Sequence, residues 1–140
     1  MRILRWIVTL PLAVLLGYLA YLIGGTINNL TTVLFLGAPL DGWQRTVTDV
    51  MAHIYMGAAM VYSAVRIAPS APRSVAIGTT ALLLAFAGAS LWSSIMIAKF
   101  YALPAIGGAI FGGLAALYAT LAGEILPYGS QPDRLRGGAG

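Results

Sequence analysis

Residues 12–23, LAVLLGYLAYLI, and residues 82–92, LLLAFAGASLW, are apolar runs without a charged residue. A strand of a membrane barrel alternates polar and apolar positions in segments of about ten residues, whereas these runs are apolar at nearly every position. Helices and closed barrels are the structures that satisfy their backbone hydrogen bonds within a bilayer. Because the barrel pattern is missing, both runs predict membrane-spanning helices.

The composition of the whole chain supports this interpretation. Of 140 residues, 59% are hydrophobic and only 9% are charged, and the mean hydropathy is +0.87. The apolar residues fall into four blocks, at 4–25, 47–67, 74–98 and 103–126. Each block is close to the ~20 residues that a helix needs to cross a hydrocarbon core of ~30 Å. The sequence therefore predicts an all-α integral membrane protein with one domain of four transmembrane helices over residues 1–126.

The connections predict how these helices are arranged. The link IAPSAPRS at 67–74 is short and proline-rich, which favours antiparallel neighbours in an antiparallel bundle. Residues 26–46 form the longest connection, and their apolar centre LTTVLFLGAPL is too short to span. We expect this outer segment to be interfacial or re-entrant, lying on lipid or against a partner. Residues 127–140 are rich in glycine and proline and predict a flexible cytoplasmic tail.

Basic residues near the helix ends predict the orientation of the chain, because cytoplasmic ends carry the excess of lysine and arginine. One side has six arginines: Arg2, Arg5, Arg66, Arg73, Arg134 and Arg136. The other side has Arg45 and Lys99. Both termini are therefore expected in the cytoplasm, and the composition, rich in alanine, glycine and arginine, suggests a bacterial inner membrane. The net charge of +4 is explained by this topology and by attraction to anionic lipids.

Small residues recur on single helix faces, where they let helices in lipid approach closely. The spacing of Gly108 and Gly112 is a G-x-x-x-G pattern. We assign one set of residues to helix packing or to a partner interface, two alternatives that the pattern leaves open. The set comprises Gly57, Ala87, Ser90, Ser94, Gly108 and Gly112, with Leu36 and Trp43 from the outer segment.

Asp49 and His53 are the candidate ligand-binding pair. They lie four residues apart and therefore share a helix face, and His53 is the single histidine of the chain. A carboxylate beside an imidazole can orient the ring for a haem, a quinone or a proton relay. The alternative is structural, because Asp49 falls in the first turn of its helix, where a negative charge is favourable. Glu124, at the other side of the membrane, is expected to pair with Arg66, Arg73 or a tail arginine.

The sequence lacks the residue patterns that several kinds of functional site require. There is no cysteine, and the single histidine has no converging acidic residues, so we predict no metal site and no intrinsic cofactor. Contacts with lipid, quinone or pigment stay open. A clustered basic patch with aromatic platforms, as nucleic-acid binding requires, is also missing. The sequence also has no constellation of a nucleophile with an acid or base, so we predict that the protein is not an enzyme.

These observations favour a non-catalytic accessory or scaffolding subunit of a larger bacterial membrane complex, which we expect to be photosynthetic, respiratory or transporting. Its partners would be that complex and membrane lipids. The alternative is a small homo-oligomeric transporter or channel, although transport would call for a charged or strongly polar group near mid-membrane. The candidates here lie near the helix ends.

A local resemblance bears on the same choice. GAPLDGWQRT at 37–46 followed by MGAAMVYSAVR at 56–66 resembles the small four-helix membrane subunit of tripartite periplasmic transporters. The resemblance covers about 30 residues of low specificity. Gln44 stands where that family usually has an acidic residue, and a proline-rich link replaces a histidine after the second helix. The resemblance implies a helical scaffold within a transporter.

Overall fold

The computed structural model describes residues 2–37, 42–68 and 71–123, except for the side chains of 2–6 and 36. These residues form α1 (Arg2–Leu36), α2 (Gly42–Ile67), α3 (Pro72–Met96), the short 3-10 helix η1 (Phe100–Ala102) and α4 (Leu103–Ala122). Within this part of the chain, four helices are long and apolar enough to cross a membrane. The all-helical prediction is therefore confirmed, and the chain is a multi-pass membrane protein.

The first helix is longer than the sequence predicts. We expected it to end near residue 25, but α1 continues to Leu36 and stops at Gly37, which has a φ of 65°. The hydroxyls of Thr26 and Thr32 donate to main-chain oxygens four residues earlier, at 2.7 and 2.8 Å, so they stay within the helix. Residues 26–36 of the predicted connection are thus helical, residues 38–41 lie outside the described part, and Gly42 begins α2.

The length of α1 has a consequence in a membrane. Its 35 residues extend about 52 Å at 1.5 Å per residue. A hydrocarbon core is only ~30 Å thick. The helix must therefore tilt or project beyond the hydrocarbon.

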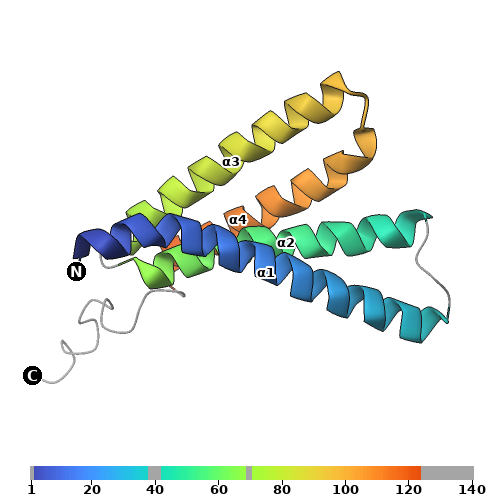
Figure 1. Cartoon of the computed structure of the whole chain (residues 1–140), viewed down its shortest axis with the longest axis horizontal. Coiled ribbons are helices and arrows are strands. Elements are labelled where there is room, and N and C mark those ends of the chain that lie inside the picture. Colours follow the sequence, from blue (N-terminus) through green and yellow to red (C-terminus); the bar gives the residue numbers. More distant parts are fainter. Residues whose placement is uncertain (1, 38–41, 69–70, 124–140) are drawn as a thin grey trace, which may run out of the picture.

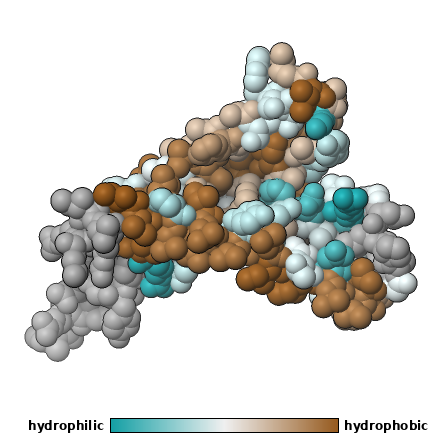
Figure 2. Space-filling model, in the orientation of Figure 1, coloured by the Kyte–Doolittle hydropathy of each residue, from teal (hydrophilic) through white to brown (hydrophobic). Residues whose placement is uncertain are grey.

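The second helix lies at the centre of the structure. It packs against α1, α3 and α4, with the closest associations to α1 and α4. Figure 1 shows α3 diverging from α2 toward the connection that leads into α4. Figure 2 shows hydrophobic residues over most of the visible face, with hydrophilic ones gathered chiefly toward the end where α2 begins.

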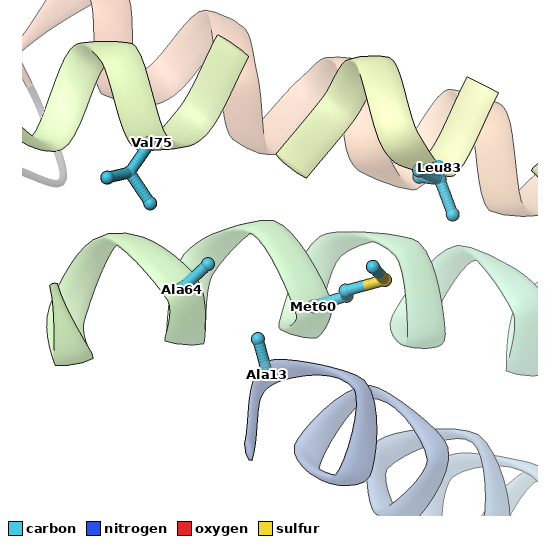
Figure 3. Close-up of a cluster of buried hydrophobic side chains, with 5 residues drawn as sticks. All are labelled: Ala13, Met60, Ala64, Val75 and Leu83. Carbon is cyan, nitrogen blue, oxygen red and sulfur yellow. The ribbon is translucent and has the colours of Figure 1, made fainter. Parts of the chain in front are cut away.

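Two small clusters of buried side chains hold the helices together. Figure 3 shows Val75 and Leu83 of α3 pointing toward Met60 and Ala64 of α2, with Ala13 of α1 on the other side. Ala13 and Ala64 are completely buried, so three helices meet over very small side chains. A second cluster joins α2, α3 and α4: Val61, Val65, Ala76 and Ala116.

Glycines bring α2 and α4 into backbone contact. A Cβ atom at Gly57 would overlap the main chain of α4 at Ala109, and one at Gly112 would overlap the main-chain oxygen of Ile54. At Gly108 a Cβ would lie 2.6 Å from the main-chain oxygen of Val50. Since lipid supplies no hydrophobic drive between helices, such close packing is the main source of their association.

The end of α3 adopts a left-handed turn without glycine. Ala98 has a φ of 54°. Its N–H donates to the oxygen of Ile95 at 3.1 Å, and the N–H of Lys99 donates to the oxygen of Ser94 at 2.8 Å. This pair of bonds defines a Schellman motif, whose left-handed position is usually glycine. A residue with a Cβ atom costs about 1–2 kcal/mol there.

Ala98→Gly is therefore expected to raise the stability of the protein by about 1 kcal/mol, because glycine removes the Cβ strain. Ala89→Gly is the matched control at an exposed position inside α3. It is expected to lower stability by about 1 kcal/mol, the usual cost of glycine in a helix. Unfolding by SDS titration in mixed micelles measures both. Destabilisation by Ala98→Gly would contradict the strained left-handed conformation of Ala98.

Candidate functional site: a polar cleft between α1 and α2

The second half of α1 and the start of α2 enclose a cleft of about 490 Å³. Figure 1 shows the two helices diverging toward the end of α1 and the start of α2. Residues of both helices line the cleft. The polar side chains that line the cleft include Thr26, Asn29, Arg45, Thr48 and Asp49. The cleft thus lies where the helices that touch at Gly24 and Gly25 begin to separate.

Arg45 and Asp49 supply the charge of this site. They stand one helical turn apart on α2, and both are exposed. Because α2 begins at Gly42, Asp49 lies beyond its first turn, and the expectation that it falls in that turn was wrong. Both also line a second cleft of about 370 Å³ on the other side of α2, together with Tyr101 and Ala105. The start of α2 therefore presents opposite charges to a space on either side of it. Asp49 is the single acidic residue in the described part of the chain.

His53 is held by its own helix and by α1. Its Nδ1 lies 2.7 Å from the main-chain oxygen of Asp49, so the ring nitrogen donates to that carbonyl. The edge of the ring meets Tyr21, with ring centroids 4.9 Å apart and an interplanar angle of 68°. In the neutral ring, Nε2 then remains as an acceptor. The predicted partners are adjacent, but the backbone of Asp49 orients the imidazole, whereas its carboxylate lines the cleft.

Comparisons with protein-family models, with curated proteins and with solved structures give no match. The geometry of the clefts and helix faces is the basis for a functional assignment.

The structure also limits metal chemistry. Across residues 2–37, 42–68 and 71–123, no three His, Cys, Asp or Glu side chains stand close enough together to hold a metal ion. A group bound through His53 would have to take further protein ligands from elsewhere. Glu124, the predicted partner of a cytoplasmic arginine, lies outside the described residues.

The remaining predicted interface residues have different environments. Gly57, Gly108 and Gly112 lie in the contact between α2 and α4, while Ala87 and Ser94 are buried on α3. Ser90 is exposed and lies outside that buried face. Trp43 is 73% exposed at the start of α2. Leu36 ends α1, and its side chain lies outside the described part.

The sequence interpretation missed the glycine contacts of α1. A Cβ atom at Gly17 would lie 3.1 Å from the Cβ of Met60, and one at Gly24 would overlap the ring of Tyr55. We expected the first helix to end near residue 25, but α1 continues, and Gly24 and Gly25 let α2 approach it. The signal was present as the seven-residue spacing of Gly17 and Gly24, which places both on one face of a helix.

Proposed function

We propose that the chain is a non-catalytic accessory or scaffolding subunit of a larger complex in a bacterial inner membrane. It would form an antiparallel bundle with both termini in the cytoplasm, as the distribution of arginines favours. The chemistry of its interior carries the proposal. Among the described residues, the polar residues that are buried as a whole all carry hydroxyls: Thr9, Ser63, Thr79, Thr80, Ser94 and Thr120. Asn28 is half-buried, and its amide nitrogen is inaccessible.

The charged side chains of the described residues lie outside the buried interior. The described ones are exposed near the helix ends: Arg45, Asp49, Arg66, Arg73 and Lys99. Transport and membrane catalysis commonly place an ionisable group inside the membrane. The buried hydroxyls are suited to a different role, since Thr120 donates to the oxygen of Ala116 at 2.8 Å and Ser63 donates to that of Ala59. Such bonds stay within one helix, so these two hydroxyls have no donor left for a substrate.

The outer ends of α1 and α2 are the proposed docking surface, which consists of Leu34, Phe35 and Trp43. These side chains are 73%, 85% and 73% exposed. Because α1 exceeds the thickness of a hydrocarbon core, its last turns are expected to stand in the outer interface or beyond it. Large apolar side chains there are suited to a protein partner or to the headgroup region. The continuous helix favours an interfacial segment over a re-entrant one.

The alternative is a small homo-oligomeric transporter or channel, or a subunit of a tripartite-type transporter. One observation favours it. The side-chain amide nitrogen of Asn28 is buried and has no hydrogen-bond partner among the described residues. A buried amide without a partner is costly, and a bound solute could supply one. Asn28 does not line the polar cleft between α1 and α2. Such a solute would therefore lie against Gly24, Ile27 and Tyr55.

Gentle detergent extraction of the native membrane through a C-terminal tag tests the proposal. Mass spectrometry and an absorption spectrum then identify what accompanies the chain. We expect stoichiometric recovery of a larger complex. Recovery of a homo-oligomer alone would support the transporter or channel, for which flux into liposomes is the next assay.

The double variant Asp49→Asn, His53→Gln is expected to leave recovery of the complex within about twofold of the wild type, because the Asp49 side chain is exposed and His53 contributes a single ring contact between α2 and α1. Tyr21 would lose this contact, and the new amides at exposed position 49 and half-buried position 53 remain within reach of water. Co-purification measures the effect. Loss of a bound pigment, haem or quinone on His53→Gln alone would overturn the structural assignment of this pair.

A further inference from the structure

An apolar groove of about 700 Å³ lies on α2, bordered by α1 and α4. Small residues from all three helices line it, namely Ala20, Ala58, Ala59 and Ala116, and Tyr55 and Tyr62 line it along α2. The groove exists because α1 and α4 both pack on α2 while these alanines fill little of the space between them. Its volume is within the range of pockets that hold small ligands.

A fixed positive charge stands at one end of the groove. Arg66 follows Tyr62 by one turn, and its Nε donates to the Tyr62 hydroxyl at 3.2 Å. The guanidinium carbon lies 5.2 Å from the centroid of the Tyr62 ring, which adds a cation–π contact. Because Tyr62 also lines the groove, its contact with Arg66 holds the guanidinium next to one of the lining side chains. The other N–H groups of Arg66 have no partner in the described part of the chain.

The groove and the arginine beyond it together match the depth of one leaflet. The lining residues of α2 run from Tyr55 to Tyr62, and Arg66 lies one turn further on. From Tyr55 to Arg66 there are eleven residues, or about 16 Å of helix. This is close to half of the ~30 Å hydrocarbon core. A partner helix would cross both leaflets and would extend beyond the groove, whose lining on α2 ends at Tyr55 and Tyr62. A free anion would use Arg66 and leave the groove empty.

We propose that the groove binds one anionic phospholipid of the cytoplasmic leaflet. Its phosphate contacts the guanidinium of Arg66, which can donate paired hydrogen bonds to phosphate oxygens. An acyl chain lies along Tyr62, Ala59 and Tyr55. The proposal rests on the membrane orientation proposed above, which places Arg66 at the cytoplasmic interface. It gives the scaffold a defined lipid partner.

Native mass spectrometry of the full chain in dodecyl maltoside micelles tests this. Titrations use dioleoyl phosphatidylglycerol and, separately, dioleoyl phosphatidylcholine. We expect one phosphatidylglycerol to bind about tenfold more tightly than phosphatidylcholine, a ratio typical of one charged hydrogen-bonded contact. Arg66→Gln should abolish the preference, and Ala59→Leu should weaken both lipids by filling the groove. Arg73→Gln, an exposed arginine outside the groove lining, is the matched control and should change neither.

Four outcomes would overturn the proposal. They are equal affinity of the wild type for the two lipids, a preference that survives Arg66→Gln, displacement of phosphatidylglycerol by millimolar inorganic phosphate, and a homodimer that Ala59→Leu dissociates without changing lipid preference. The third outcome means an anion site alone, and the fourth means that a second copy fills the groove. Because the assay uses the isolated chain, its result is independent of whether a larger complex co-purifies.

Discussion

Gly112→Ala is expected to destabilise the protein by about 2 kcal/mol, although alanine is the better helix former. The added methyl group would overlap the main-chain oxygen of Ile54. Backbone atoms of a packed helix cannot move aside as a side chain can, so α2 and α4 must separate along their contact. The loss is large because close packing is what associates helices in lipid.

Gly107→Ala is the matched control for this prediction. A Cβ atom at Gly107 meets nothing within 4 Å, so this variant is expected to be neutral or to gain up to about 1 kcal/mol from helix propensity. SDS titration in mixed micelles measures both variants. Ile54→Ala should not rescue Gly112→Ala, because the obstructing atom belongs to the main chain. Equal stability of the two glycine variants would contradict the contact.

Leu83→Ala is expected to cost about 2–3 kcal/mol, because it leaves a cavity at the centre of the bundle. Leu83 is buried, and its Cδ2 occupies the space over Gly113. Gly113→Ala should also destabilise, since its Cβ would overlap that methyl group. Here the obstruction is the end of a side chain, so Leu83→Ala should relieve it.

The double variant Leu83→Ala, Gly113→Ala tests this complementarity. The sum of the two single losses is expected to exceed the loss in the double variant by about 1–2 kcal/mol, which is typical of coupled neighbours. Leu83→Ala with Gly107→Ala is the matched pair without contact, and its effects should add. Additive effects in both pairs would show that Leu83 does not fill the space over Gly113.

Much of the fold could be predicted because apolar length alone identifies a spanning helix. The position at which α1 ends could not be predicted from the sequence. Gly24 and Gly25 have the composition of a helix end, and the sequence does not reveal that Tyr55 and Ala52 of α2 occupy the space beside them. Residues 26–36 are more polar than the preceding span, but Thr26 and Thr32 bond to their own helix and do not break it.

For the candidate site, the sequence predicted which residues share one face of a helix. The four-residue spacing placed Asp49 beside His53. Only the structure shows that the main-chain oxygen of Asp49, and not its carboxylate, accepts the hydrogen bond from the His53 ring. The groove along α2 combines α1, α2 and α4, and its arginine lies one turn outside it. Such a site depends on which helices are neighbours, and spacing within one helix does not contain that information.

Site-specific photo-crosslinking in the native membrane tests the scaffold proposal most directly, because it records contacts without extraction. A benzophenone amino acid replaces Phe35 on the proposed docking surface, and Phe111 of α4 is the control. Both are exposed aromatic positions, at 85% and 64%. We predict that the Phe35 probe gives one discrete adduct with a different protein, whereas the Phe111 probe gives none of that mass. Adducts of the Phe35 probe only with other copies of this chain would contradict the proposal.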